Sequence, residues 1–235
     1  MLLLNENAGK NIRIVSVSDD LNKLYKVLDV RSLTSDTYIL RLERKNLKFI
    51  AGQHVRVRIP DHQQFRLYSI YSGENDPYID LLIKEIPTGV YSPLLRNKKR
   101  GDLLEVKGPS GSFTLNPQYL KSERFLFVAT GTGISPFHSY ILSYPDFNYH
   151  ILHGVRYAFE AYENHVYPEG KLTICTSGDD KGHFHGRVTR YIEERINSTD
   201  YLVYLCGNSN MINDAIDILK SKGFKNDQLF IESYF

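Results

Sequence analysis

The sequence contains no tryptophan, only two methionines and only two cysteines in 235 residues. Cys175 and Cys206 are too few for a disulfide framework, an iron–sulfur cluster or a cysteine-rich zinc site. Any redox chemistry therefore depends on a bound organic group or on a centre that a partner carries.

Long apolar runs are also missing. The run Phe125–Ala129 is far too short to cross a bilayer, so we expect no membrane partner. Met1–Leu4 leads directly into polar residues and lacks a basic flank, so it does not resemble a signal peptide. We therefore expect a cytoplasmic protein.

A strong net charge is absent as well. The formal charge is +2, which gives no reason to expect a nucleic-acid partner. The pairs His150/His153 and His183/His185 each lack a clear third ligand, so no metal site is predicted. The charge is unevenly distributed, with net +6 over residues 1–122 and net −4 over 123–235. This asymmetry suggests a partner that is steered by charge.

The patterning divides the chain into two domains. Residues 1–22 are polar and aperiodic, and we interpret them as an N-terminal extension. Short alternating runs with frequent turn residues over 23–120 predict an antiparallel β-barrel. Over 121–235, apolar strands alternate with helix-like segments at about 157–165, 187–196 and 209–222. That alternation predicts an α/β domain with a parallel sheet.

Two glycine-containing segments follow expected strands of the second domain. Gly131–Phe137 follows a buried strand, and its backbone N–H groups either bind a phosphate-bearing ligand or form a tight turn. Leu205–Met211 ends the last clear strand, where Cys206 and Gly207 either face a ligand ring or fill a core and a turn.

Two further patterns lie in the barrel half. Arg66–Ser69 offers a cation, an aromatic ring and a hydroxyl at a strand end, although such residues are also ordinary in sheets. Gly89–Leu94 is interpreted as a helix start capped by Ser92, which is either an anion site or a structural helix.

In their order along the chain, the four patterns resemble the ferredoxin–NADP reductase family over about residues 25–235. The segment Gly89–Leu95 and the chain end are most similar to its bacterial subclass. The resemblance implies an antiparallel FAD-binding β-barrel followed by a parallel-sheet NAD(P)-binding α/β domain. It implies an enzyme that transfers hydride between NAD(P)H and FAD, and single electrons between FAD and ferredoxin or flavodoxin.

The resemblance assigns FAD contacts by position. It implies Arg66 on the pyrophosphate, Tyr68 stacked on the isoalloxazine and Ser69 near flavin N5. The chain end implies Tyr234 over the flavin face and Phe235 near the adenine. The full set of implied FAD-binding residues is Arg66, Leu67, Tyr68, Ser69, Leu82, Ile83, Lys84, Gly89, Val90, Tyr91, Ser92, Thr132, Tyr234 and Phe235.

It also assigns nicotinamide-nucleotide contacts and catalytic roles. The implied NAD(P)-binding residues are Gly131, Thr132, Gly133, Pro136, Arg156, Ser177, Arg187, Cys206, Gly207 and Met211. The implied catalytic residues are Ser69, Cys206, Glu232 and Tyr234, with Ser69 and Glu232 able to relay a proton.

The choice between NADP and NAD depends on groups that would meet a 2′-phosphate. Arg156 and Arg187 match basic positions of NADP-using relatives and favour NADPH. The segment Cys175–Asp180 lacks the arginine that many relatives have there, and Asp179 or Asp180 would repel a phosphate. We expect NADPH to be preferred.

The basic run Arg96, Lys98, Lys99 and Arg100 is either a solvated loop or a docking patch for an acidic ferredoxin or flavodoxin. Two other functions fit the same motifs. One is the NAD(P)H-dependent reductase component of an oxygenase. The other is a non-catalytic flavin subunit that conducts electrons within a larger complex.

Overall fold

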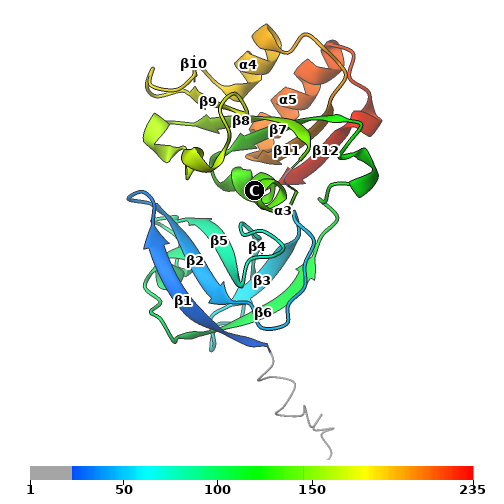
Figure 1. Cartoon of the computed structure of the whole chain (residues 1–235). Coiled ribbons are helices and arrows are strands. Elements are labelled where there is room, and N and C mark those ends of the chain that lie inside the picture. Colours follow the sequence, from blue (N-terminus) through cyan, green and yellow to red (C-terminus); the bar gives the residue numbers. More distant parts are fainter. Residues whose placement is uncertain (1–22, 145, 235) are drawn as a thin grey trace, which may run out of the picture.

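The computed structural model describes residues 23–144 and 146–234, so the expected extension 1–22 lies outside the described residues. Two stacked units, each built on one sheet, are visible in Figure 1. The chain passes from the first sheet to the second between Ser110 and Arg124. The domain boundary at 120/121 stays a prediction.

The first unit is an antiparallel sheet of six strands in the order β4-β3-β6-β1-β2-β5. A bridge between Ile70 and Leu81 joins the two edge strands and closes the sheet into a barrel. Alternate apolar residues such as Val55 and Val57 fill its interior. The strands are β1 (Leu24–Ser32), β2 (Thr37–Glu43), β3 (His54–Arg58), β4 (Arg66–Ser69), β5 (Tyr78–Lys84) and β6 (Leu103–Ser110), with α2 (Tyr91–Arg96) between β5 and β6.

The second unit is a parallel sheet in the order β10-β9-β8-β7-β11-β12. Its strands are β7 (Arg124–Thr130), β8 (Asn148–Val155), β9 (Leu172–Thr176), β10 (Phe184–His185), β11 (Leu202–Gly207) and β12 (Leu229–Ser233). Its helices are α3 (Ser135–Ser143), α4 (Val188–Arg195) and α5 (Ser209–Ser221), and 3₁₀ turns are η1 (Pro117–Tyr119), η2 (Gly131–Ile134), η3 (Ala158–Glu160), η4 (Asn164–Val166) and η5 (Asn226–Gln228). The predicted fold class is thus confirmed.

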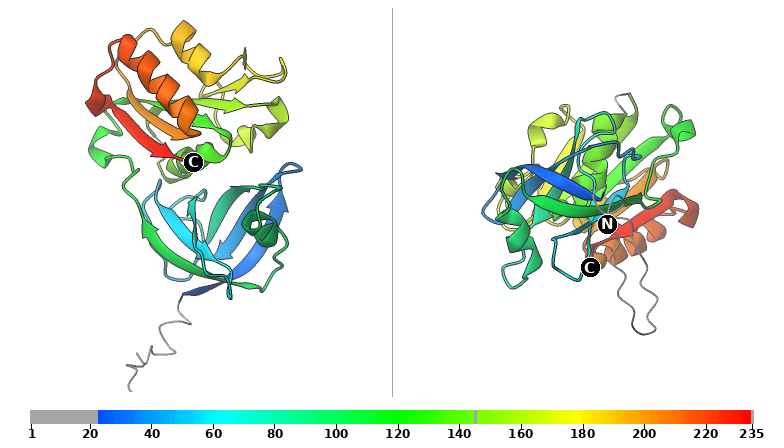
Figure 2. Two further views of the ribbon diagram at one scale, coloured as in Figure 1. Left: turned by 180° about the vertical axis from the view of Figure 1, so that it is seen from behind. Right: turned by 90° about the horizontal axis from the view of Figure 1, so that it is seen from below.

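Strand β7 is buried on both faces, as its continuous apolar run predicts. Phe125 and Phe127 face α3 and the barrel, whereas Leu126 and Val128 face α4 and α5. Figure 2 shows α4 and α5 on the face of the sheet that points away from the barrel.

The prediction of a helix at about 157–165 is wrong. Only the short turns η3 and η4 form there, and Glu163 adopts a left-handed conformation with φ 46°. Glu163 pairs with Arg31 of the barrel at 2.7 Å, and Tyr162 Oη lies 3.1 Å from Thr37 Oγ1. Contacts to the other unit therefore replace the helical hydrogen bonds that local propensity favours.

Helix α3 joins the two units. Ser139 donates to the Ser72 carbonyl at 2.7 Å, and Tyr140 donates to the Phe113 carbonyl at 2.5 Å. One apolar cluster contains Leu82 and Phe113 of the barrel half together with Phe127 and Tyr140 of the second unit. The two units consequently share a continuous core.

None of the helices in the described ranges is long and apolar enough to span a membrane.

Candidate functional site

The site lies where the carboxyl ends of two parallel strands face the end of a barrel strand. After β7 the strands β8, β9 and β10 are added on one side, and β11 and β12 are added on the other, so the strand order reverses between the parallel strands β7 and β11. Ligands of open α/β sheets bind at such switch points. Strand β12 runs along the sheet edge toward the barrel, as Figure 1 shows.

Glycines allow the two strand ends to approach each other closely. A Cβ at Gly133 would collide with the carbonyl of Cys206, and one at Gly207 would collide with the Thr130 side chain. Gly207 also has φ +130°, a conformation that side-chain-bearing residues rarely adopt. At Gly131, with φ +52°, the Cβ position faces open space, so this turn leaves room for a ligand.

Four predicted residues meet in this place. Ser69 Oγ donates to Glu232 Oε2 at 3.0 Å, and Tyr234 Oη donates to Ser69 Oγ. The Tyr234 N–H donates to the Gly207 carbonyl at 2.8 Å, and its hydroxyl also interacts with the Cys206 thiol. Strand β12 holds Glu232 opposite Cys206 in register. The structure thus brings together Ser69, Cys206, Glu232 and Tyr234 from β4, β11 and the chain end.

Burial determines the protonation of this cluster. It raises the pKa of Glu232 to about 7, partly opposed by the Ser69 hydrogen bond, so the carboxyl titrates near neutrality. Burial also raises the pKa of Cys206 well above its usual value. Cys206 is therefore a neutral thiol at physiological pH.

A histidine that the sequence did not single out borders this cluster. His54 in β3 pairs directly with Ser69 of β4, and its Nδ1 lies 3.7 Å from Glu232 Oε1. Burial, together with Arg56, lowers the pKa of His54. Its position beside the motif strand was the only available signal, because Glu232 is far away in sequence.

The barrel side offers groups that suit a flavin nucleotide. Arg66 is exposed and pairs with no carboxylate among residues 23–144 and 146–234; it contacts the Phe65 carbonyl and the Tyr91 ring. Leu67 is 53% exposed, and Tyr68 is partly buried against the barrel core. Beyond the Ile70–Leu81 bridge, the described part of β5 has only β2 as a strand partner. The Arg66 guanidinium suits a phosphate, and the exposed Leu67 suits the face of a flat ring. The open edge of β5 suits the polar edge of such a ring.

The implied flavin contacts differ in their availability. Leu82 and Ile83 are buried in β5, and Lys84 pairs with Asp36 at 3.2 Å and Glu160 at 3.9 Å. Lys84 thus offers backbone groups, while its ammonium already has partners. Phe235 lies outside the described residues.

The predicted cap at Ser92 is wrong. Helix α2 begins at Tyr91 with Val90 as N-cap, and no side chain caps it. The Ser92 hydroxyl instead accepts a 2.9 Å hydrogen bond from the Ile86 N–H, which fixes the preceding turn. Tyr91 Oη is also engaged, because it donates to the Val57 carbonyl at 3.0 Å. Gly89 N–H donates to the Ile86 carbonyl at 2.8 Å, whereas Val90 is 73% exposed.

The nucleotide side follows the sheet edge outward from Gly131. Thr132 and Pro136 belong to η2 and to the first turn of α3. Arg156, Ser177 and Arg187 are exposed beyond β8, β9 and β10, and the two arginines have no ion pair in the described ranges. Met211 is 8% exposed and packs in the core under α5. The Met211 side chain therefore does not join the other residues that were predicted to bind the nucleotide.

The two acidic residues of the loop after β9 differ. The Asp179 carboxylate accepts the Ala158 N–H at 3.0 Å and the Lys181 N–H at 3.3 Å, and the Ala158 bond contributes most to lowering its pKa. Asp179 thus fastens the loop to the turn after β8. Asp180 is exposed and remains the carboxylate that would meet an incoming phosphate.

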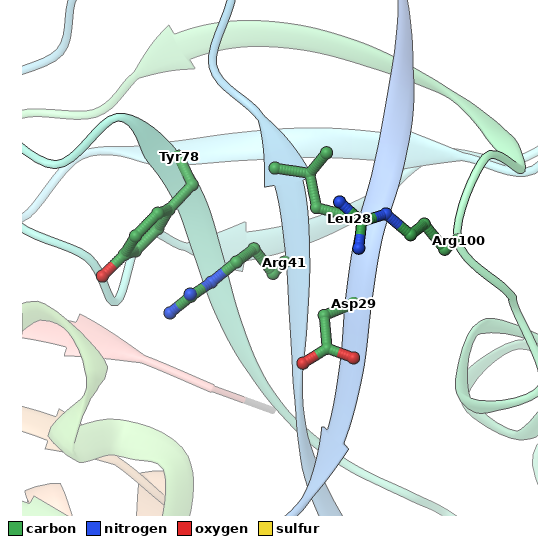
Figure 3. A pocket seen from close by; sticks show the side chains of 5 residues that line it. All are labelled: Leu28, Asp29, Arg41, Tyr78 and Arg100. Atoms are coloured by element: carbon green, nitrogen blue, oxygen red, sulfur yellow. The ribbon is translucent and has the colours of Figure 1, made fainter.

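The basic run does not form one free patch. Arg96 is engaged by the Ser35 carbonyl at 2.6 Å and Glu85 at 3.0 Å. Lys98 is partly exposed, and Lys99 and Arg100 are exposed. Figure 3 shows the Arg100 side chain extending over β1 beside Leu28, in a shallow pocket that Arg41 also lines. Of the four predicted docking residues, Arg96 is thus the one whose charge is already paired within the barrel.

Within the described ranges, no group of three or more histidine, cysteine, aspartate or glutamate side chains is arranged to hold a metal ion.

Residues 25–115 match the model of the oxidoreductase FAD-binding domain family. The chain is 27% identical over 228 residues to the toluate 1,2-dioxygenase electron transfer component of Pseudomonas putida, covering 88% of this chain and 66% of that protein. The chain therefore spans just under two thirds of that relative. It is 28% identical over 214 residues to the flavodoxin/ferredoxin–NADP reductase of Escherichia coli, covering 81% and 86% of the two chains.

Among solved structures, a ferredoxin NADP⁺ reductase from Neisseria gonorrhoeae with bound FAD and NADP is similar in fold. The TM-score is 0.79 at 21% identity, and the match covers 90% of this chain and 98% of that chain. The expected resemblance and the two-domain fold class are both confirmed by these comparisons.

Proposed function

We propose, from the premise that residues 25–115 are an oxidoreductase FAD-binding domain, that the protein is an FAD-dependent ferredoxin/flavodoxin–NAD(P) reductase. It would take hydride from NAD(P)H and pass electrons singly to a ferredoxin or flavodoxin. We place this reaction in the cytoplasm, as the sequence predicts.

One observation carries the proposal. Ser69 of the FAD-binding domain is hydrogen-bonded to Glu232 and Tyr234, at the switch point of a parallel sheet. A barrel and an α/β domain that each held an unrelated ligand would have no need to join polar groups at their junction. A reaction between two bound groups does require both domains to contribute to one place.

FAD, when bound, accepts a hydride and returns its electrons one at a time. The chain's own residues provide placement and electrostatics. Arg66 would bind the pyrophosphate, and the open edge of β5 would bind the polar edge of the ring. Ser69, whose hydroxyl position is fixed by two neighbours, would orient the reacting edge, and Glu232 would hold a proton beside it.

The second domain would bring the nicotinamide. The Gly131–Gly133 turn would hold its pyrophosphate, because Gly131 leaves open space there. Cys206 and Gly207 would border the ring. Tyr234 occupies the space between Ser69 and Cys206, so it must move before a nicotinamide can enter.

NADPH is the nucleotide that these residues favour. Arg156 and Arg187 are exposed without carboxylate partners in the described ranges, and Ser177 adds a hydroxyl nearby in the fold. The Asp179 carboxylate is taken up by two backbone N–H groups, so it repels a phosphate less than its charge suggests. Asp180, which is exposed, is the carboxylate that opposes the 2′-phosphate most.

The test is anaerobic mixing of the purified protein with NADPH and with NADH, following flavin absorbance. We expect a yellow protein that NADPH bleaches faster. Ser69→Ala should slow bleaching at least tenfold while FAD stays bound, and exposed Ser112→Ala should not. Equal rates in the wild type and Ser69→Ala would contradict the assigned role. A colourless protein that cannot be reconstituted with FAD would overturn the proposal.

A second candidate is the NAD(P)H-dependent reductase component of an oxygenase. It is favoured by the similarity to a dioxygenase electron transfer component over 88% of this chain. Reduced protein should then be reoxidised faster by an oxygenase-associated ferredoxin than by flavodoxin. A protein that binds FAD but is reduced only within a larger complex would instead be a non-catalytic electron-conducting subunit.

A further inference from the structure

We infer that His54 is the outer member of a proton relay, Ser69–Glu232–His54, that connects the junction of the two domains to water. The inference rests on the proposed function, because that reaction releases a proton which must leave a buried place. His54 acts through Glu232, so it is a positioning and relay residue that need not touch a ligand.

The polar atoms form a series with one gap that is wider than a hydrogen bond. Ser69 Oγ donates to Glu232 Oε2 at 3.0 Å, and the other carboxyl oxygen, Oε1, lies 3.7 Å from His54 Nδ1. His54 Nε2 lies 3.1 Å from Ser110 Oγ. The Glu232 carboxyl therefore directs Oε2 toward Ser69 and Oε1 toward His54. The 3.7 Å separation exceeds a hydrogen bond, so the proposed relay requires a small rotation of the Glu232 side chain or a bridging water at this step.

Exposure increases along this series. Ser69 is buried, at 7% exposure. The Glu232 side chain is 17% exposed and the His54 side chain 24%. Ser110 is exposed. The series therefore leads from the junction outward, as a proton path to solvent requires.

The His54 ring is held in a built position. His54 lies directly opposite Ser69 in the β3–β4 pair, and the register of β3 against β6 shifts between His54 and Arg56. At Gly111, with φ +108°, a Cβ would press against His54 Nδ1. The absence of a side chain there leaves room for the ring, while Ser110 fixes its outer nitrogen.

The charges around both groups favour transfer near neutral pH. Glu232 is faced by Cys206 of β11, Tyr234 and Tyr140 of α3, all of which remain neutral because burial raises their pKa values. Burial, and after it the charge of Arg56, lowers the pKa of His54 and keeps the imidazole neutral. The pKa of Glu232, about 7, lets the carboxyl accept and release a proton at physiological pH.

The proton balance defines the task. One NADPH and two oxidised one-electron carriers give NADP⁺, two reduced carriers and one proton. The proton reaches Glu232 through the Ser69 hydroxyl. The Glu232 O–H bond then breaks as an N–H bond forms at His54 Nδ1, and the N–H bond at Nε2 breaks as water beside Ser110 takes that proton. Imidazole suits this step because it accepts at one nitrogen and donates at the other.

The kinetic test separates proton release from hydride delivery. In His54→Phe, reoxidation by a one-electron acceptor should slow about tenfold more than reduction by NADPH does. The solvent isotope effect on reoxidation should rise from about 1 to about 2. Added imidazole should restore the rate, because a small base can replace the lost ring. His54→Gln, which keeps a hydrogen bond but cannot titrate, should show the same slow reoxidation as His54→Phe. Exposed His165→Gln should match the wild type.

A titration supplies a readout that is independent of turnover. In ¹⁵N-histidine-labelled protein, the His54 ring should titrate in two phases, one of them following Glu232. Glu232→Gln should leave a single phase, and exposed Glu169→Gln should leave both.

The outcomes distinguish this inference from the proposed function. A wild type that NADPH reduces, together with unchanged reoxidation in His54→Phe and no response to imidazole, overturns the relay alone. A His54 titration that is identical in wild type and Glu232→Gln also overturns it. A wild type that neither nucleotide reduces overturns the proposed function, and the relay with it.

Discussion

Ser69 and Glu232, 163 positions apart in the sequence, are joined by a 3.0 Å hydrogen bond between the barrel and the parallel sheet. The bond requires β4 and β12 to end at the same place. It links the Arg66–Ser69 strand of the barrel directly to strand β12 of the parallel sheet.

The first prediction concerns the stability of the protein as a function of pH. The pKa of Glu232 is raised to about 7 in the folded chain, against 4.5 for an ordinary glutamate. A raised folded pKa favours folding below pH 4.5, and this contribution is lost as the pH rises toward 7. Glu232→Gln should therefore gain about 2–3 kcal/mol relative to the wild type between pH 5 and pH 8.

Chemical denaturation at pH 5, 6, 7 and 8 measures this difference. The exposed control Glu169→Gln should show a difference from the wild type that does not vary with pH. A constant difference for Glu232→Gln would mean that this carboxyl is ionised in the folded protein throughout the range.

The second prediction concerns Tyr234. Tyr234 occupies the space between Ser69 and Cys206, so a ligand ring must displace it. Tyr234→Ser removes this competition, and oxidised nucleotide should bind at least tenfold more tightly, about 1.4 kcal/mol. Equilibrium titration measures the affinity, with Tyr119→Ser, at an exposed tyrosine on η1, as the control. Weaker binding in Tyr234→Ser would mean that the ring supports the nucleotide.

A third prediction tests the preference for NADPH. Arg156→Gln and Arg187→Gln should each raise the KM for NADPH about tenfold or more, with little effect on NADH, because only the 2′-phosphate loses a partner. Arg190→Gln is the matched control, since Arg190 is paired with Glu194 within α4. Asp180→Asn should lower the KM for NADPH. Parallel changes for both nucleotides would place the arginines elsewhere on the ligand.

The fourth prediction divides the basic run by function. Arg96→Gln should cost about 1–3 kcal/mol of stability, because it loses charged hydrogen bonds to Ser35 and Glu85. The triple variant of Lys98, Lys99 and Arg100 to glutamine should leave the melting temperature nearly unchanged. It should slow reduction of an acidic carrier at low salt, and the difference should vanish at high salt. A salt-independent rate in the wild type would argue against docking at this loop.

Much of the fold could be predicted from the residues. Alternation at Val55 and Val57 predicts a half-buried strand, and the apolar run Phe125–Ala129 predicts a strand covered on both faces. Glycines at 131, 133 and 207 indicated unusual turns, and the structure shows why two of them tolerate no side chain. These signals are local, so a single sequence carries them.

The errors arose where distant contacts override local preference. Residues 157–165 have helix-forming composition, yet Glu163 turns left-handed to reach Arg31. Ser92 has the chemistry of a cap, but its hydroxyl bonds to the Ile86 N–H. Neither partner is recognisable before the fold is known.

His54 and β12 illustrate what the sequence could not reveal. His54 has no motif, and its importance comes from Glu232, which reaches it only when β12 pairs with β11. Strand β12 itself was missed because Leu229–Ser233 alternates weakly and is only partly buried at the sheet edge. The role of a chain terminus depends on where the fold directs it.

The shared aromatic core around α3 has a consequence for how a nucleotide would enter. Swinging the halves apart as rigid bodies would expose Phe113 and Tyr140 to water and break the hydrogen bond between them. A hinge at this junction is therefore costly, and neither half is expected to be stable when expressed separately. On the proposed function, entry of the nucleotide would therefore need only a local rotation of the Tyr234 ring and no motion of one half against the other.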